Sequence, residues 1–199
     1  MEPFNEFIKV FLKIALIILL ITIRPVSSNK TYETEEASFN QIEMKDVDRV
    51  DRWRPRSLGI WLAVPDVIIC DGAPVSLERV ESAISWWTDR GYLFGDIIQK
   101  QPGETCHESG VDGFITIESA GSGFDASYMA ITHIKSNNVS GEILAARVTI
   151  LFNGNRERLL EHEIGHALGW RHCNRRGHIM HPYMSQGGWN DSHVSLVED

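Results

Sequence analysis

Four residues near the C-terminal end of the chain have the types and the spacing needed to bind a metal ion and activate water. His162 and His166 stand four residues apart, so on a helix both imidazoles project from the same face, as two ligands of one metal must. Glu163 is offset by about 100° around that helix, which places its carboxylate beside the two histidines. Residues 158–172 are therefore expected to contain an active-site helix and the turn that follows it.

The third ligand depends on Gly169, which comes three residues after His166. A glycine at this point can adopt a positive φ angle and end the helix in a sharp turn, which returns His172 toward the metal. Three neutral imidazoles and one water form a tetrahedral zinc site with an exchangeable position, which is the arrangement of a catalytic zinc. Glu163 is then the predicted general base, accepting a proton from the zinc-activated water.

The elements that position these residues are indicated by the apolar pattern upstream. Residues 58–64 form a short apolar run that predicts a buried strand. Ser76 is a predicted cap of a helix that ends near Gly91, and Asn155 is a predicted cap of the active-site helix. Further strands are predicted at 96–99, 113–118, 128–135 and 143–152. This order predicts an α/β or α+β sheet with one long helix on one side and the second helix beneath it.

Two motifs resemble those of a known family. The run His162-Glu163-Ile164-Gly165-His166-Ala167-Leu168-Gly169-Trp170-Arg171-His172 is similar to the extended zinc signature of the metzincin metallopeptidases. Gly177-His178-Ile179-Met180-His181-Pro182 resembles the methionine turn of the same group, with Met180 as the turn methionine. The resemblance is strongest to small, matrixin-like catalytic domains, and the predicted strand order fits it.

The resemblance implies an α+β, zincin-like fold, with a mixed twisted sheet of four to five strands, a backing helix, an active-site helix and an irregular C-terminal subdomain. It implies that Met180 forms a hydrophobic floor under the imidazoles and that Pro182, Tyr183 and Met184 wall a substrate pocket. The His/Asp-rich loop that holds structural zinc and calcium in matrixins has no counterpart. One catalytic Zn²⁺ and no second zinc are therefore expected, and calcium stays open. The remaining histidines lack ligand spacing, and most are expected at the surface.

The N-terminal part of the chain is a separate unit. Residues 1–28 contain a basic flank, a short apolar stretch and a small-residue exit, which is the layout of a secretory signal peptide, with an uncleaved membrane anchor as the alternative. Residues 29–56 are polar and acidic and indicate a linker or a short pro-segment. Residues 57–199 are the expected catalytic domain. We therefore expect a secreted protein, or one anchored to a membrane and facing away from the cytoplasm.

Charge and cysteine content narrow the partners and the compartment. The net charge of −8 argues against a nucleic-acid-binding protein, which needs a basic face for phosphates. Of the three cysteines, Cys70 and Cys106 flank one predicted helix-and-strand unit and are the expected disulfide pair, although three free thiols stay possible because pairing does not follow from sequence. A monomer acting on peptide or protein substrates is expected.

Together these features predict a secreted zinc metalloendopeptidase with Glu163 as its catalytic residue. Two other functions stay open. One is a zinc-bearing, non-catalytic peptide-binding or toxin-like module, against which the intact Glu163 argues, because a binder needs no base beside the metal. The other is an amidase acting on cell-wall peptides, in which the bond broken is chemically the same.

Overall fold

The computed structural model describes residues 32–33 and 55–197. The expected signal or anchor segment, residues 1–28, lies outside the described residues. Of the expected linker or pro-segment, residues 29–56, only residues 32–33 and 55–56 are described. None of the helices in the described part has the length and apolar character needed to cross a membrane.

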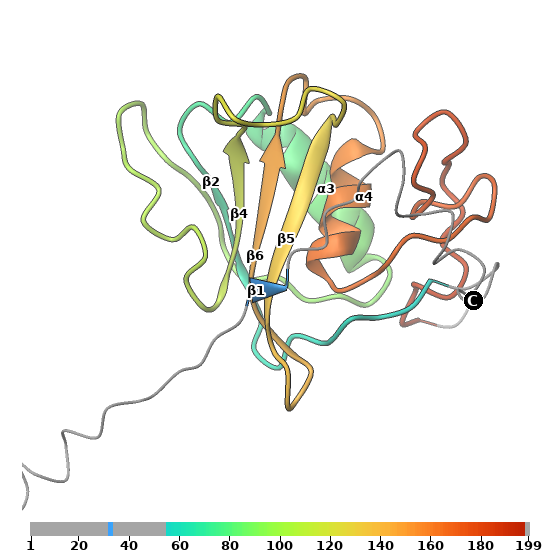
Figure 1. The fold of residues 1–199 in the computed structure, drawn as a ribbon. Helices are drawn as coiled ribbons and strands as arrows, with labels where there is room; N and C mark the ends of the chain where they lie inside the picture. The colour runs from blue at the N-terminus through green and yellow to red at the C-terminus, as the bar shows by residue number, and fades with distance from the viewer. Residues whose placement is uncertain (1–31, 34–54, 198–199) are drawn as a thin grey trace, which may run out of the picture.

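The fold is an α+β domain built on one mixed sheet, as the sequence predicted (Figure 1). The elements are, in chain order, β1 (Tyr32–Glu33), β2 (Asp66–Ile69), α3 (Leu77–Thr88), β3 (Ile97–Gln99), β4 (Phe114–Ser119), β5 (Ala130–Asn137), β6 (Glu142–Ile150) and α4 (Leu159–Ala167). The strand order is β1-β5-β6-β4-β2-β3. Strands β3, β2, β4 and β6 run parallel, whereas β5 is antiparallel to β6 and β1 is antiparallel to β5.

The core lies between the sheet and the two helices, which share one face of the sheet (Figure 1). Helix α3 begins at the predicted cap, because the Ser76 side chain accepts a hydrogen bond from the Arg79 backbone N–H. Its buried residues recur at three- and four-residue spacing, as an amphipathic helix requires: Val80, Ala83, Ile84 and Trp87. After α4 the described chain, through residue 197, consists of turns and isolated bridges, which is the expected irregular C-terminal subdomain.

The prediction of a strand at residues 58–64 is wrong. The first strand after residue 55 is β2, and residues 58–64 instead make an isolated bridge, between Ile60 and Glu142 at the start of β6, and hydrogen bonds to the end of α4 and the turn after it. The Leu58 N–H donates to the Gly169 carbonyl at 2.6 Å, and the Trp61 indole donates to the Ala167 carbonyl at 2.8 Å. Leu58 and Trp61 pack against the core, whereas the side chains of Ile60 and Leu62 are 60% and 66% exposed. The apolar run therefore supports the end of α4 instead of adding a strand.

The predicted cap of α4 is also wrong. Asn155 accepts a hydrogen bond from the Ser76 N–H at 2.9 Å, so it joins the loop before α4 to the start of α3. Helix α4 begins three residues later, after Arg158, which has a left-handed φ of 69° and makes no side-chain cap. The Arg158 guanidinium instead donates to the Gly187 carbonyl in the C-terminal subdomain.

Candidate metal centre

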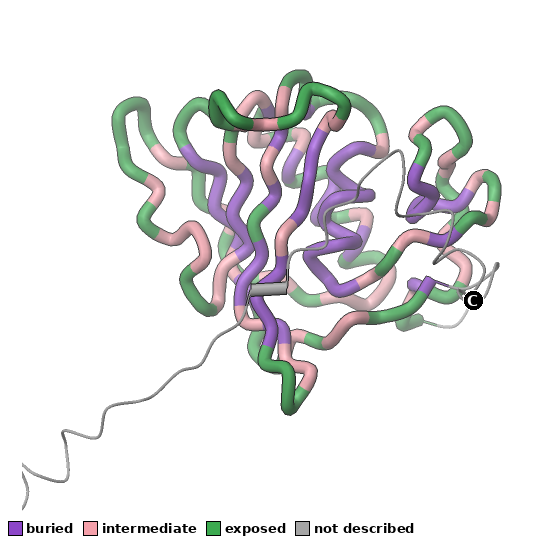
Figure 2. The backbone as a smooth tube through the Cα atoms, in the orientation of Figure 1, coloured by how far each residue is buried: buried purple, intermediate pink, exposed green. Residues whose placement is uncertain are grey.

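Helix α4 carries two of the predicted ligands and is buried along its whole length (Figure 2). Leu159, Leu160 and Ile164 face the core, which leaves His162 and His166 together on another face of the helix. The residue before the first histidine is fixed by α3. Arg79 forms a partly buried ion pair with the Glu161 carboxylate, and the Trp87 indole donates to the Glu161 carbonyl at 2.8 Å.

The turn after α4 brings His172 to the same point. Gly169 has a φ of 97°, as the sequence predicted, and a side chain there would collide with the Gly59 carbonyl at 2.7 Å. The Trp170 N–H donates back to the Gly165 carbonyl at 2.9 Å, which closes the turn. His172 follows two residues later.

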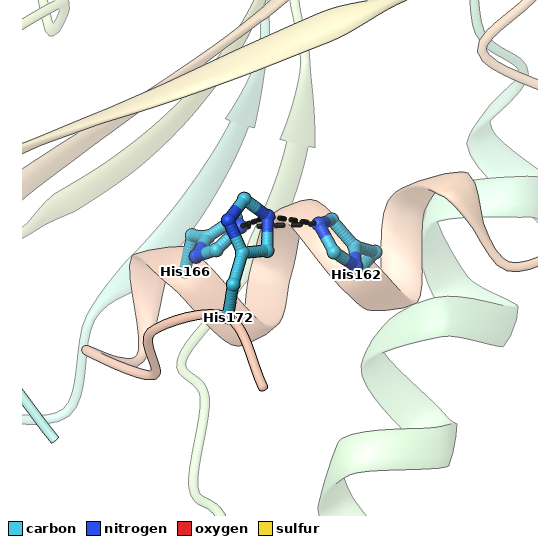
Figure 3. A group of neighbouring side chains, drawn as sticks. All are labelled: His162, His166 and His172. Atoms are coloured by element: carbon cyan, nitrogen blue, oxygen red, sulfur yellow. Dashed lines mark hydrogen bonds between the residues drawn. The ribbon is translucent and has the colours of Figure 1, made fainter. Parts of the chain in front are cut away.

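The three imidazoles converge through their Nε2 atoms (Figure 3). Each pair of Nε2 atoms is 3.1 Å apart. His162 Nδ1 donates to the Ile179 carbonyl at 2.7 Å, and His166 Nδ1 donates to the Trp170 carbonyl at 2.6 Å. A neutral imidazole carries one proton, so the Nε2 atoms of these two residues present lone pairs toward the centre of the cluster.

This geometry fits a metal ion. Three nitrogens bound to one tetrahedral zinc at about 2.0 to 2.1 Å are about 3.3 Å apart, close to the spacing in the structure. Facing lone pairs repel one another unless a cation lies between them. His162, His166 and His172 therefore have the donor type, the orientation and the separation that a zinc ion requires.

The electrostatics of the cluster keep the ligands unprotonated. Burial lowers the pKa of His162 to about 4 and that of His166 to about 3, and the neighbouring imidazoles add to the effect. The pKa of His172 is also well below its usual range, again because of burial first and the other two histidines second. All three are neutral at pH 7, which is the form that binds a metal.

Glu163 lies beside the cluster and does not belong to the ligand set. Burial raises the pKa of its carboxyl to about 7, and a hydrogen bond from Thr132 opposes that rise. The Thr132 hydroxyl is 2.7 Å from Glu163 Oε2. Glu163 is thus a buried carboxyl directly after the first histidine, held by Thr132 of β5.

Met180 packs directly against the active-site helix. It is fully buried, and an ideal Cβ built on Gly165 would lie 2.5 Å from its sulfur. The turn around it is fixed by His178, whose Nδ1 accepts from the Met180 N–H at 2.9 Å and whose Nε2 donates to the Ser192 carbonyl at 3.0 Å. The Met180 carbonyl accepts from the Cys173 N–H, one residue after the third histidine.

Comparison with known families agrees with this geometry. Residues 124–199 match the family described as matrixin, a stretch that includes α4, the three histidines and Met180. The domain is matrixin-like. The match supports a zinc metallopeptidase type of function. No curated protein matches the chain.

The predicted pocket residues of the matrixin-like domain follow Met180 directly. Pro182 is buried, Met184 is partly buried against the core, and Tyr183 is 39% exposed. His181 Nδ1 accepts from the Tyr183 N–H at 3.1 Å, which fixes the local turn. The role of these residues in substrate binding stays a prediction.

Three contacts of the matrixin-like domain were not predicted from the sequence. The first is the hydrogen bond from Thr132 of β5 to Glu163, because Thr132 belongs to no recognisable motif. His178 was grouped with the histidines expected mostly at the surface, yet it is fully buried and supports the methionine turn. The Arg79–Glu161 pair joins residues 82 positions apart. Of the three, only His178 had a local signal, since it stands two residues before Met180.

Two of the three cysteines of the matrixin-like domain are joined, and the third directly follows His172. Cys70 and Cys106 form a disulfide with a Cα–Cα distance of 5.4 Å, which is the pair expected from the sequence. Cys173 is free and buried. Burial raises the pKa of its thiol, so it is a neutral packing residue at pH 7.

Proposed function

We propose that this protein is a secreted, zinc-dependent endopeptidase whose catalytic domain comprises residues 57–199. The observation that carries the proposal is the convergence of three buried Nε2 atoms, each 3.1 Å from the others, with the Glu163 carboxylate beside them. His162, His166 and His172 would hold the ion. When bound there, zinc supplies a Lewis acid that makes water nucleophilic and stabilises negative charge on the scissile carbonyl.

The proton transfers belong to Glu163. As general base it accepts the proton of the attacking water, and as general acid it returns that proton to the leaving amine. In the zinc-free protein burial raises the pKa of this carboxyl to about 7, and a bound Zn²⁺ would lower it again, which favours the ionised form that accepts the proton. Met180 takes no part in proton transfer; it packs against α4 at Gly165.

An extended peptide is the substrate we favour. Residues 130–133 of β5 have no strand on their outer side within the described part of the chain, because β1 pairs only with Ile134 and Lys135. A peptide can add to such an edge through backbone hydrogen bonds. Thr132, which contacts Glu163, lies in this stretch, so a peptide paired there would pass beside the catalytic carboxylate.

Secretion is supported by two independent features. Residues 1–28 have the composition of a signal peptide, and residues 29–56 that of a linker or pro-segment. The Cys70–Cys106 disulfide is typical of proteins that leave the reducing cytoplasm.

The test combines metal content with peptide cleavage. The purified protein should bind one equivalent of zinc by elemental analysis and cleave a mixed peptide library, with products identified by mass spectrometry. Glu163→Gln should keep the zinc and lose about a hundred- to ten-thousand-fold in turnover. Glu157→Gln, an exposed glutamate just before α4, is the matched control and should behave like the parent.

Each outcome decides between the functions. Zinc with no cleavage of any peptide by the parent would contradict the peptidase and leave a binding module. Cleavage restricted to cell-wall peptides would indicate the amidase. A protein that binds no zinc would contradict the metal centre itself.

A further inference from the structure

Thr132 is the polar residue that β5 presents to the active-site helix. Its neighbours on the same face of the strand, Ala130 and Ile134, belong to the apolar core, whereas the Thr132 hydroxyl lies against Glu163. Thr132 is only 4% exposed. Its place is fixed by the pairing of β5 with β6, where Thr132 stands opposite Val148.

The hydroxyl has two acceptors within reach and one proton to donate. Thr132 Oγ1 is 2.7 Å from Glu163 Oε2 and 3.1 Å from the Glu163 backbone carbonyl. An ionised carboxylate is the stronger acceptor, and its distance is the shorter, so the proton is directed to Oε2. The hydrogen bond from Thr132 reaches Oε2, so the other carboxylate oxygen, Oε1, is not the one that Thr132 holds.

We propose that Thr132 is a positioning residue for the general base: its hydroxyl holds Glu163 Oε2 and so directs Oε1 toward the attacking water. The inference rests on the peptidase function proposed above and adds to it a residue from outside the zinc motif. A β-branched side chain suits this role, because its χ1 angle is restricted and the hydroxyl direction is therefore fixed by the strand.

A merely structural role makes a different prediction. If the hydroxyl served only to join β5 to α4 through the Glu163 carbonyl, its loss would lower stability and leave turnover per folded molecule unchanged. If it orients the carboxylate, its loss would lower kcat and leave KM and zinc content unchanged. The two roles are therefore separated by the division of the effect between kcat, KM and unfolding.

The experiment compares three variants of the full-length protein. Thr132→Val keeps the shape and removes the hydroxyl, Thr132→Ser restores it, and Thr116→Val removes the hydroxyl of another buried threonine of the sheet. We expect Thr132→Val to lose about ten- to a hundredfold in kcat, as for the loss of one hydrogen bond to a charged group, with KM within about twofold and one zinc retained. Thr132→Ser should recover most of the loss, and Thr116→Val should match the parent in kcat.

Several results would overturn the inference. A Thr132→Val protein with kcat within about threefold of the parent would do so, and so would a serine variant as impaired as the valine variant. A loss of kcat that only follows a loss of zinc or of folded protein would assign Thr132 a structural role. If the valine variant does not fold, Thr132→Ala against Thr132→Ser gives the same comparison. An inactive parent would overturn the proposed function, whereas an active parent with an unaffected Thr132→Val overturns this inference alone.

Discussion

Replacing Gly165 by alanine would place a methyl group between the active-site helix and the residues that support it. Gly165 is the residue directly before His166 on α4. An ideal Cβ at this position would lie 2.5 Å from the Met180 sulfur and 2.8 Å from Cζ2 of the Trp87 ring. Ordinary contacts between such atoms are about 3.5 to 4.0 Å, so both neighbours would have to move by about 1 Å.

Two opposing effects set the magnitude. Alanine is favoured over glycine inside a helix by about 1 kcal/mol. Overpacking a well-packed core costs about 1 to 3 kcal/mol. Met180 and Trp87 are both fully buried, and the Trp87 indole is held by its hydrogen bond to the Glu161 carbonyl, so the upper part of that range applies. The net change is therefore a loss of about 2 kcal/mol in the free energy of unfolding.

Urea unfolding of parent and variant measures this loss. Gly121→Ala is the control, since a Cβ there meets nothing within 4 Å, and its effect should stay within about 1 kcal/mol in either direction. In a Met180→Ala background, the cost of Gly165→Ala should shrink by at least about 1 kcal/mol, because the closest clash is gone. A Gly165→Ala protein as stable as the parent, or more stable, would refute the claim that Met180 and Trp87 pack against this glycine.

Three further perturbations test other parts of the domain. Replacing Cys70 and Cys106 by serine opens a loop of 36 residues and should lower the free energy of unfolding by about 4 kcal/mol in urea titrations, and a loss below about 1 kcal/mol would contradict this. In the zinc-free protein the pKa of the Glu163 carboxyl is raised from 4.5 to about 7. The protonated carboxyl therefore contributes to the free energy of unfolding in full below pH 4.5, and this contribution is lost as the pH rises through 7. With a chelator present, the difference in free energy of unfolding between Glu163→Gln and the parent should therefore favour the variant by about 2 kcal/mol more at pH 8 than at pH 5. An equal difference at the two pH values would contradict the raised pKa. Ser76→Ala removes the acceptor for the Arg79 N–H and should cost about 1 kcal/mol in thermal or urea unfolding, whereas unchanged stability would show that the cap contributes nothing.

The features that were predictable from sequence depend on local spacing. The cap at Ser76, the apolar face of α3 and the turn at Gly169 each follow from residues within one or two helical turns. The convergence of His162, His166 and His172 has the same origin, because a segment of eleven residues, helix and turn together, contains all three. Local geometry is sufficient where every participant belongs to one short segment.

The features that were not predictable depend on contacts between distant segments. An apolar run does not reveal whether a neighbouring strand will pair with it. Strands β3 and β4 pair with β2, residues 66–69, whereas residues 58–64 make one isolated bridge, between Ile60 and Glu142. Asn155 has the residue type of a cap, yet its amide reaches Ser76, 79 positions away. Thr132 contacts Glu163 only because the register of β5 on β6 turns that side chain toward α4.

The short strand β1 has a consequence for how the protein behaves in solution. By pairing with Ile134 and Lys135 it occupies backbone groups on the outer edge of the sheet. An uncovered edge offers a row of donors and acceptors to strands of other molecules and favours self-association. A chain shortened past Glu33 would lack β1 and present more of that edge, so we expect it to self-associate more readily. Where the chain is trimmed therefore affects its colloidal stability as well as its length.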